Sequence, residues 1–128
     1  MSLATGPAAR LTIILHADAY WHHHSLSDEI LHRALEAGLA GASRFHGIEG
    51  FGRSGRLHTD IDPDTMSSLP AEVVIVDPSP ERLREFLSQL DEILDHGIAI
   101  IDTVEVAIVS RPAPPVTPGP RSTRSETK

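Results

Sequence analysis

The chain has 128 residues, with 11 Lys and Arg against 18 Asp and Glu and a formal net charge of −7. This length fits one domain, and the negative charge opposes attraction to phosphate backbones, so nucleic acid is not an expected partner. Cysteine is absent, which excludes disulfides, thiolate metal sites and a cysteine nucleophile. No apolar run approaches the ~20 residues that span a bilayer, so we expect a cytoplasmic protein without direct membrane insertion.

Composition divides the chain into three parts. Residues 1–9 are predicted to be a flexible N-terminus, and residues 10–109 form the predicted domain. From Ser110 onward the chain carries five of its ten prolines and no aromatic residue. Such a segment has too little apolar surface to offset the entropy lost on ordering, so residues 110–128 are predicted to be a disordered Pro-rich tail.

The first half of the domain is predicted to contain a strand, a helix and a second strand. Residues 10–17 are rich in Ile and Leu and are followed by polar residues, which is typical of a buried strand. Ser25 is the expected N-cap of a helix whose apolar residues share one face, and Gly38 is its expected stop. A glycine-interrupted strand then begins at Ala42.

The second half is predicted to contain a strand, a helix and a last strand. Residues 71–77 are almost continuously apolar and indicate the third strand. Ser79 before Pro80 is the favoured arrangement for an N-cap and first helical position, and Gly97 ends the predicted helix. Residues 98–109 form the last predicted strand.

The resulting order, β-α-β-β-α-β, is that of the ferredoxin-like α+β fold, in which two helices cover one face of a four-stranded antiparallel sheet. The opposite face would be polar if it met water. In residues 73–76 and 98–101, however, both the odd and the even positions are apolar, so apolar side chains point to both faces of the sheet. We therefore expect a second copy of the chain to cover that face in a homo-oligomer.

A long connection, from about residue 53 to residue 70, separates the second and third strands, and such loops tend to be functional. Its stem "GIEGFGRSG" offers four glycines whose N–H groups could converge on an anion, with Arg53 and Arg56 as charged donors. Alternatively, the glycines mark a bulge where the strand leaves the sheet, and the arginines are solvated. Spacing alone favours the bulge, because the stem matches neither a Walker loop nor a dinucleotide fingerprint.

The element order and three segments, "GLAGASRFHGIEGFGRSGRLHT", "SLPAEVVIVD" and "LDEILDHGIAIIDTVEV", resemble the PII-like family known as domain of unknown function 190. The resemblance covers about residues 10–109. It implies a PII-like homotrimer with ligand clefts between subunits, acting as a nucleotide-binding signalling or regulatory protein.

Classical PII proteins open the loop after the second strand with Gly-Phe-Gly-Arg-Gln-Lys-Gly, and the comparable residues here are 50–56. The resemblance implies that Gly50, Gly52 and Arg53 lie against the phosphates of an adenine nucleotide or similar anion. The other predicted ligand-binding residues are Phe51, Arg56, His58 and Thr59, of which His58 and Thr59 match the family's motif but have no established chemistry in it. Ser54 replaces the Gln that PII proteins use with magnesium and 2-oxoglutarate, which argues against a 2-oxoglutarate sensor. The second PII phosphate loop has no counterpart, because "DHG" passes straight into the last strand.

Histidine is the other chemical feature, with eight copies and a run "WHHH" at residues 21–24. In an extended loop His22 and His24 would point the same way, with His16 near them, and imidazoles bind divalent transition metals. Consecutive histidines do not match a zinc spacing. The alternative function is therefore a trimeric divalent-metal binder that resembles copper-tolerance proteins, and a ligand-free interaction module is a third.

An enzyme is not expected. The sequence supplies no nucleophile motif, and the acidic "DIDPD" lies in a segment expected to be mobile, whereas catalysis requires preorganised groups. We expect instead that a ligand in the intersubunit cleft changes the order of the long loop and so controls a partner. The resemblance points to a membrane transporter as that partner, first of the fluoride-channel type.

Overall fold

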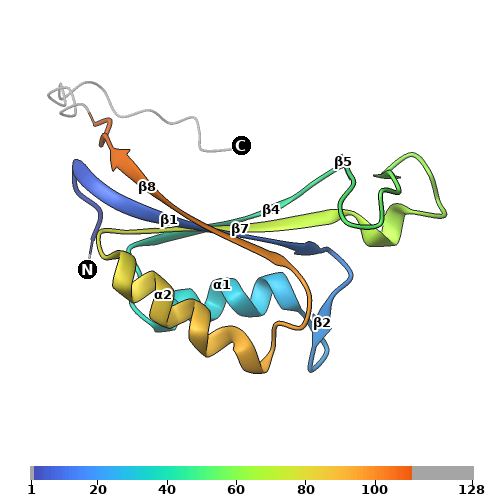
Figure 1. Cartoon of the computed structure of the whole chain (residues 1–128), viewed down its shortest axis with the longest axis horizontal. Coiled ribbons are helices and arrows are strands. Elements are labelled where there is room, and N and C mark those ends of the chain that lie inside the picture. Colours follow the sequence, from blue (N-terminus) through green and yellow to red (C-terminus); the bar gives the residue numbers. More distant parts are fainter. Residues whose placement is uncertain (1, 111–128) are drawn as a thin grey trace, which may run out of the picture.

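The computed structural model describes residues 2–110 and contains a four-stranded antiparallel sheet with two helices on one face (Figure 1). The sheet has the order β4-β7-β1-β8. Its strands and the two helices are β1 (Gly6–His16), α1 (Leu26–Glu36), β4 (Gly41–His46), β7 (Pro70–Asp77), α2 (Pro80–Gln89) and β8 (Ile98–Val106). The smaller elements are β2 (Tyr20–Trp21), β3 (His24–Ser25), β5 (Glu49–Gly50), β6 (His58–Thr59) and two 3₁₀ turns, η1 (Met66–Ser68) and η2 (Leu90–Glu92). The predicted ferredoxin-like α+β fold is confirmed.

Several predicted boundaries were wrong. β1 begins at Gly6, so residues 6–9 belong to the sheet and not to a flexible end. Gly6 pairs with Val106, and Ala9 pairs with Asp77, so backbone pairing on both sides orders a segment that lacks large apolar side chains. The second helix ends at Gln89 and continues as η2, well before Gly97, and the last strand ends at Val106. The predicted tail from residue 111 onward lies outside the described residues.

Each helix begins at the predicted N-cap and buries one apolar stripe. The Ser25 hydroxyl accepts from the N–H of Asp28 at 3.2 Å, and the Ser79 hydroxyl accepts from the N–H of Arg82 at 3.2 Å. The core between helices and sheet is formed mainly by Leu11, Ile13, Ile30, Val73, Ile75, Leu83, Phe86 and Leu90. Burial of each large side chain contributes about 1.5–3 kcal/mol. Within residues 2–110, no helix has the length and hydropathy needed to cross a bilayer.

A buried carboxylate at the end of β7 joins both helices to the sheet. Asp77 is fully buried and accepts from the N–H groups of Ala40 and Ser79, each at 3.0 Å. Arg82 Nη1 lies 3.4 Å from the same carboxylate, and its Nη2 donates to the Gly38 carbonyl at 3.0 Å, just beyond α1. The charge is thus compensated where burial would otherwise be costly.

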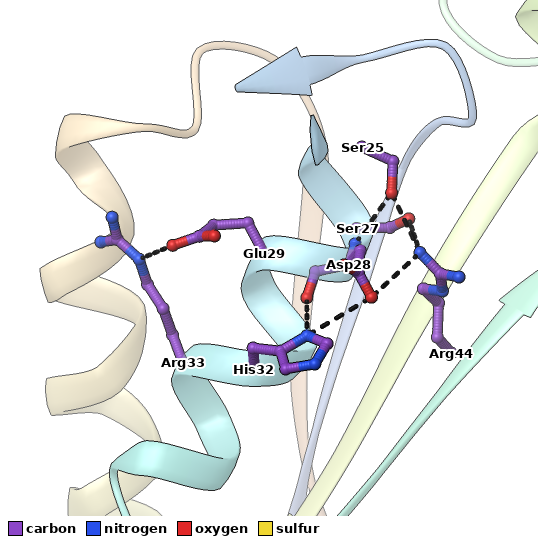
Figure 2. Close-up of polar contacts among 7 residues, drawn as sticks. All are labelled: Ser25, Ser27, Asp28, Glu29, His32, Arg33 and Arg44. Carbon is purple, nitrogen blue, oxygen red and sulfur yellow. Dashed lines mark hydrogen bonds and ion pairs between the residues drawn. The ribbon is translucent and has the colours of Figure 1, made fainter. Parts of the chain in front are cut away.

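A second polar cluster holds the edge strand β4 against the start of α1 (Figure 2). Arg44 of β4 donates to the Ser25 hydroxyl at 2.9 Å and lies 3.6 Å from the Asp28 carboxylate. His32, one turn further along α1, places Nδ1 2.9 Å from the Asp28 carbonyl and 3.3 Å from its carboxylate. The hydrogen bond to that carbonyl, followed by the carboxylate charge, raises the pKa of His32.

The sheet face opposite the helices is largely apolar, as predicted from the sequence. Cross-strand pairs place the following side chains on it: Ile14, Phe45, Val74, Val76, Ile98 and Ile100. Phe45, Ile98 and Ile100 are each about half exposed. Towards one end of this face Arg10 holds Asp102 through two hydrogen bonds of 3.2 and 2.7 Å, which lower the pKa of Asp102. Thr12, Ser43 and Glu72 share this face with the apolar side chains. Large apolar side chains that are exposed on one sheet face are typical of an interaction surface.

Candidate functional site

The chain between β4 and β7 forms an arm, residues 47–69, that extends past the end of the sheet (Figure 1). β5 and β6 pair within it, and the N–H of Gly55 donates to the Gly52 carbonyl at 2.9 Å, which closes a turn with Arg53 and Ser54 at its corners. The Thr65 hydroxyl accepts from the N–H of Thr59 at 3.1 Å. The predicted long loop from about residue 53 to residue 70 contains the short strand β6 and the 3₁₀ turn η1.

Packing explains some glycines of the arm and leaves one unexplained. A Cβ on Gly47 would lie 2.6 Å from Pro70 Cγ, and one on Gly50 would lie 3.2 Å from it. Gly55 has φ of +71°, which favours glycine. A Cβ on Gly52 would meet no atom within 4 Å, and its φ is not positive. Contact with Pro70 and a positive φ thus account for Gly47, Gly50 and Gly55, whereas nothing within residues 2–110 requires glycine at position 52.

A cavity of about 600 Å³ lies between the arm and the end of the sheet, within the range usual for small-molecule sites. β1 ends at this cavity and β8 begins there, because Ile14 pairs with Ile98. The lining consists of residues 14–16, 50–54, 58, 68, 70 and 96–98. A smaller cavity of about 280 Å³ between α1 and β4 is lined mainly by Ala and Leu and offers few polar groups. The larger cavity is therefore the candidate site, and we call it the arm pocket.

The polar side chains of the arm pocket include one guanidinium and several imidazoles. Its lining includes Arg53 and three histidines, His16, His58 and His96, and no carboxylate among the described residues. The whole chain, in contrast, has 18 Asp and Glu against 11 Lys and Arg. A concave site that combines a guanidinium with imidazoles in an otherwise acidic chain attracts anions, and its apolar walls suit an organic body.

Two of the histidines lie close together. His16 places Nδ1 3.3 Å from the Ser68 carbonyl, which can only accept, so Nδ1 carries a proton and Nε2 is left for other contacts. The His58 ring centroid is 6.1 Å from that of His16. His58 Nδ1 is buried and has no hydrogen-bond partner within residues 2–110. An orphaned buried polar atom costs about 1–3 kcal/mol and is uncommon in native proteins.

The structure places some of the predicted ligand-binding residues in the lining of the arm pocket and others outside it. The following predicted ligand residues line the arm pocket: Gly50, Phe51, Gly52, Arg53 and His58. Arg56 and Thr59 do not; Thr59 bonds within the arm, and the Arg56 N–H donates to the Ser54 hydroxyl. A role for these two in ligand binding stays a prediction.

Sequence reasoning did not assign His16 and His96 to this site. The order of the strands was the sequence feature that could have placed them there. In the ferredoxin-like order the first and last strands are antiparallel neighbours, so the end of "RLTIILHA" meets the start of the last strand after "DHG". Pairing of Ile14 with Ile98 is the contact that brings the two histidines to one pocket.

The expected metal site at the His run is not supported. Trp21 pairs with His24, and His22 and His23 form the turn between them with φ of 49° and 71°. A two-residue hairpin of this kind needs positive φ at both central positions, so the predicted extended loop was wrong. The His22 ring stacks on Trp21 at 3.9 Å, and His16 lies instead beside the arm. Within residues 2–110 no group of three or more His, Cys, Asp or Glu could hold a metal ion.

Comparisons with known proteins agree with this fold. The model of one family, DUF190, described as "Uncharacterized ACR, COG1993", matches residues 8–106. A UPF0166 protein of Aquifex aeolicus (strain VF5) is 34% identical over 77 residues, which are 60% of this chain and 71% of that protein.

Two solved structures are similar in fold. The nitrogen regulatory PII-like protein CPII from Thiomonas intermedia K12, bound to ADP, AMP and bicarbonate, has a TM-score of 0.54 and 16% identity, with 84% of this chain and 100% of that chain covered. A Thermus thermophilus protein described as a putative PII-like signaling protein has a TM-score of 0.55 and 17% identity, with 81% and 93% covered. At these identities the likeness shows the fold alone.

Proposed function

Because the chain belongs to the DUF190 family, we propose that it is a PII-like regulatory protein that binds an adenine nucleotide or similar anion in the arm pocket. The observation that carries this proposal is the lining of the pocket, which includes Arg53 and three histidines and, within residues 2–110, no carboxylate, although the chain as a whole is acidic. The ADP and AMP bound by the Thiomonas protein support an adenine nucleotide as the first anion to test.

In this proposal Arg53 makes charge-assisted hydrogen bonds to a phosphate, and the missing side chain of Gly52 leaves room for the phosphate to approach the backbone. Phe51 and Ile98 provide apolar surface for the base. This arrangement binds and orients an anion, and we propose no catalytic step for it.

We also propose that the functional unit is a trimer in which a neighbouring subunit completes the pocket. The open apolar face of the sheet supports a partner of the same chain. The arm supports it too, because Phe51 is 75% and Ile61 85% exposed in the single subunit. Large apolar side chains that are left exposed around a half-open pocket are suited to contact with another subunit.

Regulation would follow from the position of the arm. A ligand that binds one arm position more tightly than another shifts the population towards it, and a partner that contacts the arm detects the change. As that partner we propose a membrane transporter, first of the fluoride-channel type, on the basis of the family resemblance.

Calorimetric titration with AMP, ADP, ATP and cyclic AMP tests the binding proposal. Arg53→Ala should weaken binding by about 10- to 100-fold, because a hydrogen bond to a charged group contributes about 1.5–3 kcal/mol. Arg84→Ala is the matched control, since it removes the same charge from an exposed position of α2 outside the pocket lining, and it should change affinity by less than about threefold. Equal losses in both variants, or no saturable binding of any of the four nucleotides, would overturn the proposal.

A further inference from the structure

Arg53 differs from most arginines of the chain because it has no carboxylate partner. Residues 2–110 contain seven arginines, and four of them form ion pairs with carboxylates: Arg10, Arg33, Arg44 and Arg82. The Arg53 guanidinium forms no ion pair or hydrogen bond with any described residue, although acidic residues outnumber basic ones. It is therefore available to an anionic ligand without the loss of an existing ion pair.

Arg53 is also the one side chain with a permanent positive charge among the described residues that line the arm pocket. No carboxylate lines the pocket within residues 2–110, but carboxylates lie close along the chain, since Glu49 and Asp95 each immediately precede a lining residue. The chain as a whole has a formal net charge of −7. The pocket thus has one strong anion-binding group in surroundings that repel further negative charge.

We propose that the arm pocket selects a nucleotide with a single phosphate group and binds it without a divalent metal ion. This inference rests on the proposed function, and it adds the number of phosphate groups and the metal independence of the ligand. One guanidinium forms two parallel hydrogen bonds with one phosphate group. A second or third phosphate group finds no further permanent cation in the described lining and is repelled by the acidic chain around it.

The same lining bears on the metal ion that accompanies nucleotides in many proteins. Mg²⁺ in such sites is held by one or two carboxylates together with phosphate oxygens and water. The lining contributed by residues 2–110 offers no carboxylate. The metal of a magnesium–nucleotide complex therefore finds no charged ligand there, and the phosphate should bind through Arg53 whether or not magnesium is present.

A neighbouring copy of the chain adds few uncommitted cations to the pocket. Besides Arg53, the arginines of residues 2–110 that form no ion pair with a described residue are Arg56 and Arg84. Neither lines the arm pocket. Arg56 follows Arg53 by three positions on the same arm, so it is the nearest such group along the chain for a second phosphate. Substitution of Arg56 therefore reports whether a second phosphate is held.

The first test is calorimetric titration of the full-length protein with adenosine, AMP, ADP and ATP, each with magnesium and with a chelator. These ligands share the base and the sugar, so their affinities differ only through the phosphates. At about pH 8 imidazole in water is uncharged, which leaves the guanidinium as the main cation. AMP should bind at least about tenfold more tightly than adenosine and than ATP, and magnesium should change AMP affinity by less than about threefold.

Two variants test the charge count itself. Arg56→Ala should change the affinities for AMP and ADP by the same factor. Ser54→Arg places a second guanidinium in the pocket lining, at the other corner of the turn that carries Arg53, so it should raise ADP affinity at least threefold more than AMP affinity. Ser88→Arg is its matched control, because it adds the same charge at an exposed position of α2 outside the lining and should leave the ratio unchanged.

The failure of this inference differs from the failure of the proposed function. Saturable AMP binding with an AMP-to-ATP affinity ratio below about ten, with a larger effect of magnesium, or with a selective loss of ADP binding in Arg56→Ala would overturn the inference alone. An equal change of the ADP-to-AMP ratio in Ser54→Arg and Ser88→Arg would do the same. Absence of saturable binding for AMP, ADP, ATP and cyclic AMP would overturn both.

Discussion

Two alanine substitutions in the arm, Gly47→Ala and Gly52→Ala, should differ in their effect on stability although the two positions are only five apart in the sequence. A Cβ at position 47 would lie 2.6 Å from Pro70 Cγ and 3.3 Å from the Pro70 carbonyl oxygen, so backbone must move. Overpacking of this kind costs about 1–3 kcal/mol. A Cβ at position 52 would meet nothing within 4 Å, and the residue has no positive φ, so Gly52→Ala should be neutral or stabilising by up to about 1 kcal/mol.

Urea unfolding followed by circular dichroism, at one fixed protein concentration, measures both changes as shifts in the midpoint with an unchanged slope. In the same samples Gly52→Ala should weaken AMP binding, because the added methyl group occupies the space through which a phosphate approaches the backbone. A Gly52→Ala variant destabilised as strongly as Gly47→Ala would refute the assignment of structural and ligand-related roles to the two glycines. Unchanged AMP affinity in Gly52→Ala would refute the ligand-related role alone.

Substitutions at three other positions test the remaining features. Asp77→Ala should lower the free energy of unfolding by about 3 kcal/mol, because it removes the buried acceptor that holds Arg82, and Asp77→Asn should cost less in the same urea assay. The hydrogen bonds from Arg10 lower the pKa of Asp102 in the folded protein. The ionised Asp102 side chain therefore stabilises the fold at pH values above the pKa of an unfolded aspartate, about 3.9, and this stabilisation is lost as the pH falls through the lower pKa of the folded state. Asp102→Asn should therefore be less stable than wild type near pH 6 and equal to it in strong acid, whereas a constant difference across that range would contradict the linkage. Ile100→Glu, at a half-exposed position of the open sheet face, should reduce the mass measured by light scattering to that of one chain without loss of circular dichroism, and an unchanged mass would exclude this face as the subunit interface.

Local sequence signals predicted the helix starts and the order of elements well. Ser25 and Ser79 each satisfy an N–H three residues ahead, an interaction that depends only on neighbouring positions. Boundaries that depend on distant pairing were predicted poorly. Gly6 belongs to β1 only because Val106 pairs with it, and no local propensity signals that contact.

The candidate site divides in the same way. The glycine and arginine stem was visible in the sequence, and resemblance to a family pointed to Arg53 and His58. The geometry of the His run was predicted wrongly, because a tight turn at His22 and His23 replaced the expected extended chain. Spacing could not reveal that turn, because non-glycine residues are uncommon at positive φ and the run contains no glycine that would signal a turn.

The sequence by itself determined the α+β class, the two capped helices, the presence of apolar side chains on both faces of the sheet and the excess of negative charge. These features depend on composition and on residues close together in the chain. Only the tertiary structure decided which glycines pack against Pro70 and which histidines share a pocket with Arg53. His16 and His96 line one pocket because β1 and β8 are antiparallel neighbours, and strand register is set by packing across the whole sheet.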